Sequence, residues 1–322
     1  MKRLYFFIVI TLLCVFVLPG EAYAAELLIP GGNVIGLELR DDSVTVAAFD
    51  DVLGANAKSA GLRIGDEILK IDGQSIDCTE DVRSALRACD GDVELIVERG
   101  GKQHRLVLNP RNTEEGFRLG VYLRCGVTGI GTVTYYDPQT HEFGTLGHGV
   151  SNGKGGLTDM TSGTAYEGQV NAVVKGQAGT PGQLKGSASA ADAVGTLQKN
   201  TPQGVFGTSR EGWTGEPLPV AEYEEITTGA ATIRSTVSGD TVQEYSVEIL
   251  KIYPEDRADN RNFLVKVTDP ALLETTGGIV QGMSGSPIIQ DGKLVGAVTH
   301  VLVNDPTTGY GIFIENMLDA AA

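Results

Sequence analysis

The chain has 322 residues, which is enough for two domains of ordinary size, and 41% of them are apolar, so each domain can bury a core. Glycine is frequent, with 43 residues, whereas aromatic residues make up only 6%, and this composition favours a mainly β architecture. The formal net charge of −16 argues against nucleic acid as a partner, because phosphate binding needs a basic surface.

The first 25 residues have the features of an export signal. Basic residues at positions 2 and 3 precede an apolar run over residues 4–19, and the small-residue motif Ala22-Tyr23-Ala24 follows. The run is short for a membrane span, which needs about 20 residues. Residues 1–25 are therefore predicted to be a signal peptide or a membrane anchor, and in both cases the rest of the chain is exported and extracytoplasmic.

A segment of different character covers residues 30–110. Strands are predicted at residues 34–39 and 44–49, and they are followed by the run AGLRIGDEILKIDG over residues 60–73. A helix is predicted near residues 78–89, because its apolar positions recur at helical spacing. Two further strands, at residues 93–98 and 104–108, complete the unit.

This segment resembles a PDZ domain of the kind found in bacterial proteases, and the run over residues 60–73 carries the resemblance. The resemblance implies that Ile35, Gly36 and Leu37 form the loop whose backbone N–H groups receive a peptide carboxylate. A peptide C-terminus or an internal strand would then add along that edge. The alternative is a PDZ fold used only as a rigid spacer.

Residues 111–116 are polar, charged and without periodicity, so they are predicted to be a linker. The domain after it, residues 117–322, is the catalytic candidate. Later strands are predicted at residues 230–235, 243–253, 262–267 and 309–314, with a short closing helix at residues 315–321.

The stretch Gly282-Met283-Ser284-Gly285-Ser286-Pro287 is the strongest signal of chemistry, and a predicted hairpin of residues 288–298 follows it. The Gly-x-Ser-Gly pattern resembles the nucleophile loop of chymotrypsin-like double-barrel proteases. A serine hydroxyl needs a neighbouring base, and the oxyanion needs backbone donors aimed at one point. We predict Ser284 as the nucleophile and the N–H groups of Gly282 and Ser284 as the oxyanion hole. The alternative is a polar turn between two strands.

The base must be one of four histidines. His148 lies between two glycines after a strand-like run, and a histidine well before the serine matches the chymotrypsin order. His300 ends the strand after the nucleophile and is the serious alternative, or it could line the substrate pocket. His104 and His141 are predicted to lie at the surface.

The acid that would orient the base is harder to assign. Asp269 shortly precedes the nucleophile, and Asp159, Asp192 and Asp240 also lie between His148 and Ser284. Spacing does not choose among them. Asp269 also fits the pattern of a turn residue before a proline.

The whole arrangement closely resembles the SpoIVB peptidase family, sporulation serine proteases of endospore-forming bacteria. The matching stretches are residues 144–149, 276–284, 297–301, 304–306 and 309–311. The resemblance implies an N-terminal PDZ domain followed by a chymotrypsin-like double β-barrel serine peptidase domain. It also implies Ser284 as nucleophile, His148 as base and Asp269 as acid.

The resemblance further implies a function: a sporulation signalling endopeptidase that cleaves a regulator of an intramembrane protease, and its own chain. The enzyme would act between the forespore and mother-cell membranes, either membrane-anchored or secreted there. No cofactor and no metal is expected, since no cysteine pattern has zinc-site spacing. Two alternatives stay open. The first is a general extracytoplasmic quality-control PDZ protease, although the PDZ domain precedes the catalytic domain here. The second is a non-catalytic PDZ binding module, although His148 and Ser284 are both intact.

Overall fold

The computed structural model describes residues 26–152, 155–254 and 261–322, so the predicted leader lies outside the described residues. The fold is mainly β, as predicted. The strands are β1 (Leu27–Pro30), β2 (Val34–Phe49), β3 (Glu67–Ile71), β4 (Gln74–Ser75), β5 (Val93–Arg99), β6 (Lys102–Leu108), β7 (Arg111–Thr113), β8 (Gly116–Arg118), β9 (Val121–Tyr136), β10 (Glu142–Thr145), β11 (Ser162–Val174), β12 (Gln183–Thr201), β13 (Gly204–Ser209), β14 (Leu218–Pro219), β15 (Gly229–Ser235), β16 (Gln243–Ile252), β17 (Phe263–Val267), β18 (Pro287–Gln290), β19 (Lys293–Leu302) and β20 (Asp305–Phe313). The helices are α2 (Ala55–Ser59), α3 (Thr79–Arg87), α4 (Pro270–Thr276) and α5 (Ile314–Ala321), with a 3-10 turn at Tyr223–Glu225.

The first barrel is a ring of antiparallel strands. β2 pairs with β9 on one side and with β11 on the other, and the ring continues through β12, β13 and β10 back to β9. Its interior is filled by a core that includes Leu37, Leu39, Phe143 and Val205. A closed ring leaves no strand edge within the barrel without a neighbour.

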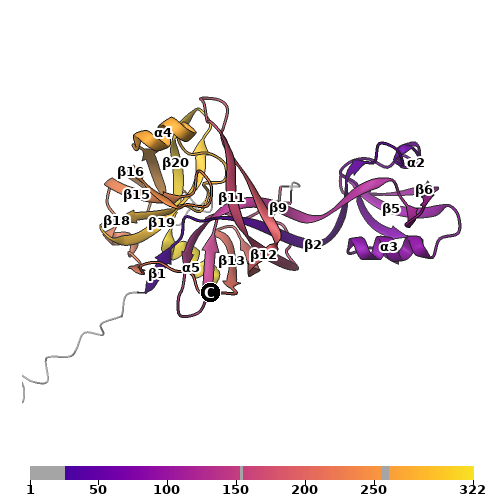
Figure 1. Cartoon of the computed structure of the whole chain (residues 1–322), viewed down its shortest axis with the longest axis horizontal. Helices are drawn as coiled ribbons and strands as arrows, with labels where there is room; N and C mark the ends of the chain where they lie inside the picture. Colours follow the sequence, from indigo (N-terminus) through magenta and orange to yellow (C-terminus); the bar gives the residue numbers. More distant parts are fainter. Residues whose placement is uncertain (1–25, 153–154, 255–260) are drawn as a thin grey trace, which may run out of the picture.

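The second barrel is formed by β15, β16, β17, β20, β19 and β18, and it is closed. Its strands alternate between the core and the surface, as in β16, where Tyr245, Val247 and Ile249 are buried and their neighbours are not. Helix α5 packs between the barrels, and its Met317 shares a core with Phe206 of the first barrel. The predicted double barrel is therefore confirmed, and Figure 1 shows it at one end of the molecule.

The PDZ domain is inserted into the first barrel. The chain leaves the barrel along β2 and returns along β9, and these two paired strands join the PDZ domain to the barrels (Figure 1). Within the barrel the last pair is Leu39 with Val127, and the first pair on the PDZ side is Val44 with Cys125. The predicted PDZ boundary at residue 30 is therefore wrong, because residues 34–39 are a barrel strand.

A bulge separates the two halves of this ribbon. On β2 the four residues 40–43 lie opposite the single residue Gly126 of β9. Gly126 has a φ of 73°, and a Cβ at this position would lie 1.9 Å from the carbonyl oxygen of Leu39, so only glycine fits. The ribbon therefore changes direction at a fixed point between the barrel and the PDZ domain.

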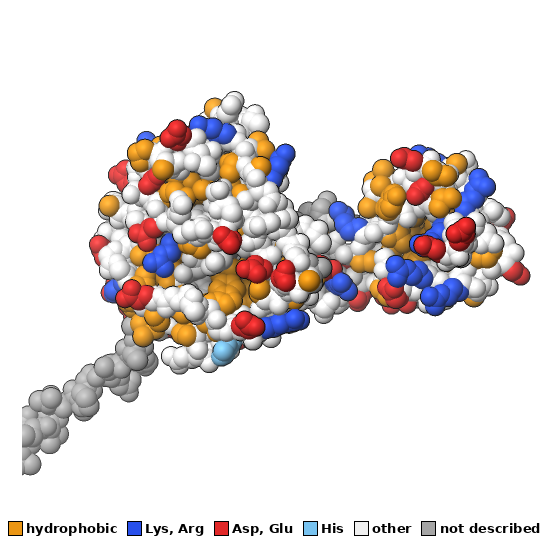
Figure 2. All heavy atoms as spheres, viewed as in Figure 1, with side chains coloured by type: hydrophobic (Ala, Val, Ile, Leu, Met, Phe, Trp, Pro, Cys, Tyr) orange, Lys and Arg blue, Asp and Glu red, His pale blue; other side chains and the backbone are white. Residues whose placement is uncertain are grey.

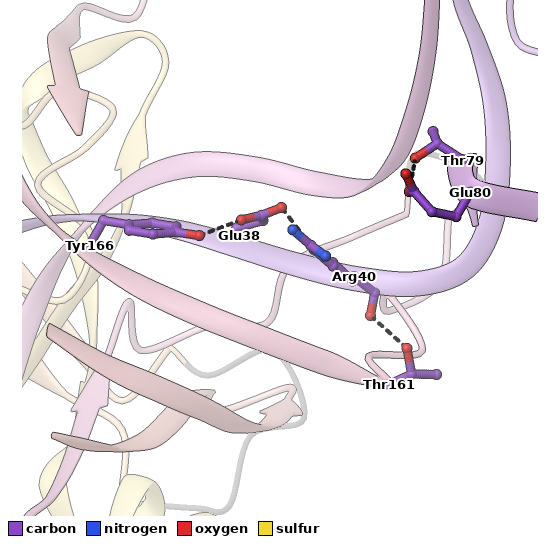
Figure 3. A network of polar contacts seen from close by, with 6 residues as sticks. All are labelled: Glu38, Arg40, Thr79, Glu80, Thr161 and Tyr166. Atoms are coloured by element: carbon purple, nitrogen blue, oxygen red, sulfur yellow. Dashed lines mark hydrogen bonds and ion pairs between the residues drawn. The ribbon is translucent and has the colours of Figure 1, made fainter. Parts of the chain in front are cut away.

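Polar contacts fix the barrel side of this junction (Figure 3). The hydroxyl of Tyr166 on β11 donates to Glu38 at 2.7 Å, and Arg40 donates to the same carboxylate at 2.9 Å. The Tyr166 hydrogen bond lowers the pKa of Glu38, although burial opposes it. Thr161 donates to the carbonyl of Arg40 at 3.3 Å. These contacts tie the exit point of β2 to the neighbouring barrel strand.

The PDZ core lies between β3, β5 and helix α3, with Ile68, Leu95 and Leu86 among its buried residues. The predicted helix and the two closing strands are confirmed as α3, β5 and β6. Residues 111–116 are not a linker, because β7 and β8 form a hairpin in which Arg111 pairs with Arg118. Phe117 of this hairpin packs on the PDZ core, which explains its order.

The described surface carries both charge signs. Figure 2 shows Lys and Arg side chains interspersed with Asp and Glu on this face, without a broad basic area. Among the residues that the structure describes, no helix combines the length and the apolar character that a membrane span requires.

Candidate active site

The nucleophile loop follows α4 and ends where β18 begins at Pro287. Two of its glycines, Gly282 and Gly285, have φ values of 100° and 97°. A Cβ on Gly285 would lie 2.0 Å from the carbonyl oxygen of Thr132, so the loop can approach the first barrel only with glycine here. Ser284, between these glycines in sequence, is partly exposed. The Gly-x-Ser-Gly pattern thus follows from how closely the two barrels meet.

The backbone donors of this loop divide into two groups. The N–H groups of Met283, Gly285 and Ser286 donate to backbone carbonyls at 3.1, 2.7 and 2.9 Å. In the described part of the chain, the N–H groups of Gly282 and Ser284 donate to no acceptor. These two are the donors that the sequence predicts for the oxyanion hole.

The orientation of these two N–H groups is fixed by hydrogen bonds to the carbonyl groups of the same two peptides. The carbonyl of Gln281 accepts from the N–H of Leu184 at 2.8 Å, and the carbonyl of Met283 accepts from the N–H of Ser286 at 2.9 Å. A planar trans peptide holds its C=O and the following N–H in opposite directions. Anchoring the two carbonyls therefore aims the N–H groups of Gly282 and Ser284 away from the anchors, as a preorganised oxyanion hole requires.

The hydroxyl of Ser284 donates to the backbone carbonyl of Thr299 on β19, at 2.7 Å. Strand pairing between β18 and β19 ends at Ala297, and the next residue, Val298, bonds through its N–H and carbonyl to Ser286 and Gly285 of the loop itself. In this arrangement the hydroxyl is held by the second barrel. A rotation about the Cα–Cβ bond of Ser284 would release it toward a base.

His148 lies on the loop that follows β10. The chain turns there through left-handed conformations, with φ values of 71° at Leu146 and 65° at Gly147. A Cβ on Gly147 would lie 2.9 Å from the Cγ2 atom of Thr299, so the loop packs directly on β19. The turn therefore places the residue before His148 against Thr299, whose carbonyl holds the Ser284 hydroxyl.

The imidazole of His148 has a defined tautomer. Its Nδ1 lies 3.0 Å from the carbonyl oxygen of Gly149, which can only accept, so Nδ1 carries the proton and Nε2 is free to act as base. Burial lowers the pKa of His148, and the Gly149 hydrogen bond opposes this only in part. The ring of His300 lies beside it, with 5.2 Å between ring centroids. His300 directly follows Thr299, whose carbonyl accepts from Ser284, so His148 and Ser284 both contact this part of β19.

Asp269 is the N-cap of α4. Its carboxylate accepts from the N–H groups of Ala271 at 2.9 Å, Leu272 at 3.0 Å and Ser246 at 3.3 Å. Within the described residues, no hydrogen bond joins His148 to a carboxylate. The structure does not bring Asp269 together with His148, and its assignment as the orienting acid stays a prediction.

The predicted carboxylate loop of the PDZ domain is wrong. Ile35, Gly36 and Leu37 are buried near the start of β2, and Gly36 pairs with Ile130 of β9 on one side and with Tyr166 of β11 on the other. Both edges of the strand are therefore used within the barrel. A peptide has no free main-chain groups to bind there.

A groove on the PDZ domain has the expected features instead. A cavity of about 950 Å³ lies between α3 and the start of β9, and Val82 and Leu86 are among the residues that line it. At this end β2 is the one partner strand of β9 among the described residues, and Val121, Tyr122 and Leu123 of β9 line the groove. The run Leu119-Gly120-Val121 leads into β9, and Gly120 has a φ of 74°. The apolar-Gly-apolar pattern of residues 35–37 occurs a second time at residues 119–121. This second occurrence could have indicated the loop from sequence, but the sequence analysis missed it.

Residues 115–318, more than half of the chain, match the family described as SpoIVB peptidase S55. The chain belongs to this family of serine peptidases. Residues 52–99 of the S55 peptidase also match the PDZ domain family, which agrees with the inserted domain. The S55 match begins after the PDZ domain, although the first barrel also needs β2.

Other similarities of this S55 peptidase are local or distant. Two proteins that carry the name of zinc metalloproteases, from Bartonella henselae and Agrobacterium fabrum, are 31% identical over 90 residues and 35% identical over 77 residues. The matches cover 26% and 24% of this chain, and only 25% and 20% of those proteins. The chain therefore spans a quarter or less of the curated relatives that it matches.

Two solved structures show a distant likeness. The PDZ domain of an SdrC-like protein from Listeria monocytogenes is 21% identical, with a TM-score of 0.22, over 26% of this chain and 87% of that one. The active form of the Rv3671c protease from M. tuberculosis is 15% identical, with a TM-score of 0.38, over 61% of this chain and 75% of that one. At such scores the fold assignment depends on the strand pairings of the S55 peptidase itself.

Proposed function

We propose that this S55 peptidase is an endopeptidase in which Ser284 is the nucleophile and His148 is the general base. The observation that carries the proposal is the pair of free, anchored N–H groups of Gly282 and Ser284 beside the Ser284 hydroxyl. The N–H of Met283 between them donates to the carbonyl of Val280, so the two donors left free are the pair that an oxyanion hole in this loop needs.

The mechanism is acyl transfer. Ser284 rotates from the Thr299 carbonyl toward Nε2 of His148, which removes the hydroxyl proton as the oxygen attacks a peptide carbonyl. The N–H groups of Gly282 and Ser284 hold the oxyanion. His148 then protonates the leaving amine. In the second half of the reaction water attacks the acyl group, His148 takes the proton of the water, and the proton returns to Ser284 as the acyl group leaves.

For the biological role, we propose sporulation signalling. The substrate would be a regulator of an intramembrane protease, with the enzyme's own chain as a second substrate, in the space between forespore and mother-cell membranes. Family membership supports this proposal, together with the leader predicted from the sequence. The groove between α3 and β9 supports a peptide C-terminus or an internal strand as a partner of the PDZ domain.

Intact-mass spectrometry of residues 26–322 tests the catalytic part. The wild-type protein should trim itself, whereas Ser284→Ala and His148→Ala should stay whole, since losing the nucleophile costs on the order of 10⁶ in rate. If no protein is trimmed, labelling by a fluorophosphonate decides: the wild type should react and Ser284→Ala should not. A Ser284→Ala protein that is trimmed at the wild-type rate would exclude Ser284 as nucleophile.

A further inference from the structure

Two buried threonines of the first barrel contact the nucleophile loop of the second. Thr132 and Thr134 lie on β9, and neither exposes any surface. The hydroxyl of Thr132 donates to the carbonyl of Gly282 at 2.8 Å, and its N–H donates to the carbonyl of Ser284 at 3.1 Å. The hydroxyl of Thr134 donates to the carbonyl of Gly285 at 2.8 Å. One strand thus holds three carbonyls of the loop.

Thr132 also holds the loop that carries the base. Its carbonyl accepts from the hydroxyl of Thr145 at 2.6 Å and from the N–H of Leu146 at 3.3 Å. His148 follows Leu146 by one intervening residue. All three polar groups of Thr132 are therefore used, two on the nucleophile loop and one on the base loop.

The nucleophile loop needs such support because of its own sequence. Gly282 and Gly285 flank the catalytic dipeptide, and glycine leaves the backbone free to adopt several conformations. A flip of the peptide before Gly282 would turn that donor away, and movement of the peptides that join Gly282 to Gly285 would displace the N–H of Ser284. The threonine hydroxyls fix the peptide planes that follow Gly282 and Gly285, while the anchors on Gln281 and Met283 fix the others.

We propose that Thr132, assisted by Thr134, is a positioning residue for the peptidase reaction. It fixes the position of the nucleophile loop relative to the base loop across the interface between the barrels. It touches neither the substrate nor the reacting atoms. The proposal rests on the proposed function of Ser284 and His148, and it predicts a loss of nucleophile reactivity beyond any loss of stability.

The matched control is Thr236. Its side chain is as buried as that of Thr132, and its hydroxyl donates to the carbonyl of Gly32 at 3.0 Å. Like Thr132, it therefore makes a buried hydroxyl-to-carbonyl hydrogen bond to a residue that is distant in the sequence. No hydrogen bond of Thr236 within the described residues reaches residues 282–285 or 145–148. Thr132→Val and Thr236→Val should therefore cost similar stability, about 1–3 kcal/mol for an acceptor left unsatisfied.

The experiment measures thermal unfolding and the second-order rate of fluorophosphonate labelling for residues 26–322. Removing one direct oxyanion donor costs about 10²–10³ in rate, so an indirect support should cost about 10-fold to 100-fold in Thr132→Val. Thr132→Ser keeps the hydroxyl and should restore labelling to within about 3-fold, since the bond to Gly282 can re-form. Thr236→Val should label at the wild-type rate.

Equal labelling of Thr132→Val and wild type, or an equal loss in Thr236→Val, would overturn the proposal. If Thr132→Val does not fold, Thr134→Val decides, because it removes a single bond to Gly285 and should still slow labelling. Failure of the proposed function is a different result: the wild type itself would then not be labelled at Ser284.

Discussion

At the scale of single residues, His148, the proposed base, has no carboxylate of the described residues within hydrogen-bond distance. The carbonyl of Gly149 selects the tautomer, and burial favours the neutral ring. Both effects leave Nε2 free to accept a proton at neutral pH. The ring of His300 lies against the same side chain, so the surroundings of the base are completed by the second barrel.

A pH profile follows from this environment. Because burial lowers the pKa of His148, the acid limb of labelling or kcat/KM should have its midpoint below the ordinary histidine value of about 6.5. The unfolded chain takes up this proton at a higher pH than the folded protein. Stability should therefore fall as the pH drops below about 6.5, and it should do so less in His148→Gln. A midpoint above 6.5 would instead indicate a carboxylate that stabilises the imidazolium.

Asp269 gives a second residue-scale prediction. Asparagine is also a good N-cap, so Asp269→Asn should keep the unfolding temperature and label within a few-fold of the wild type. Asp269→Ala should lose about 1 kcal/mol of stability with the cap. A loss of about 10⁴ in Asp269→Asn at unchanged stability would show that the carboxylate orients the base after all.

Sequence reasoning was informative for residues whose role is encoded locally. The glycines around Ser284 and His148 are needed for tight turns, and such turns can be identified from a few adjacent residues. Thr132 gives no comparable signal, because its meaning depends on carbonyls about 150 residues away. The Asp-Pro pair indicated a turn residue at Asp269, and the structure makes it the N-cap of α4, whereas spacing could not decide whether its carboxylate reaches His148.

At the scale of elements, the strands were mostly predicted and their partners were not. The strands now named β15, β16 and β17, the β18–β19 hairpin and α5 lie close to where the sequence placed them. The strand that begins at Val34 was also predicted, but it was assigned to the wrong domain. An apolar strand next to a glycine looks the same in a PDZ edge and in a barrel wall, because pairing is decided by distant segments.

Two glycine substitutions separate these assignments. In Gly36→Ala the new Cβ would lie 2.3 Å from the Cβ of Ala188, so the first barrel should be disrupted and fluorophosphonate labelling should be lost. In Gly120→Ala the Cβ would lie 2.3 Å from the Leu53 carbonyl oxygen, so only the PDZ loop should be disturbed. Labelling of Gly120→Ala should therefore match the wild type. The opposite pattern would return residues 35–37 to the PDZ domain.

At the scale of the whole molecule, the insertion of the PDZ domain determines which segments of the chain can fold independently. Residues 117–322 lack β1 and β2, so the first barrel would be open at β9 and β11. We expect this fragment to show no cooperative unfolding and no labelling. Joining Leu39 to Val127 through an Asn-Gly turn instead removes the PDZ domain and keeps the ring, because these two residues are paired neighbours.

The shortened protein should unfold cooperatively, as followed by circular dichroism, and should react with the fluorophosphonate. Cooperative folding of residues 117–322, or failure of the shortened protein in two different turn sequences, would contradict the insertion. Sequence reasoning could not anticipate this topology, since the linear order of a PDZ-like run and a protease-like run reads as two consecutive domains.

The insertion also predicts an order of folding events. Leu39 must find Val127, which lies about 90 residues later, and closing so long a loop carries a large entropic cost. The intervening residues contain their own core and can fold first, which brings Val44 and Cys125 side by side. From then on β2 and β9 meet as the two arms of a short hairpin. We therefore expect the PDZ domain to form before the first barrel and to bring β2 and β9 together for its closure.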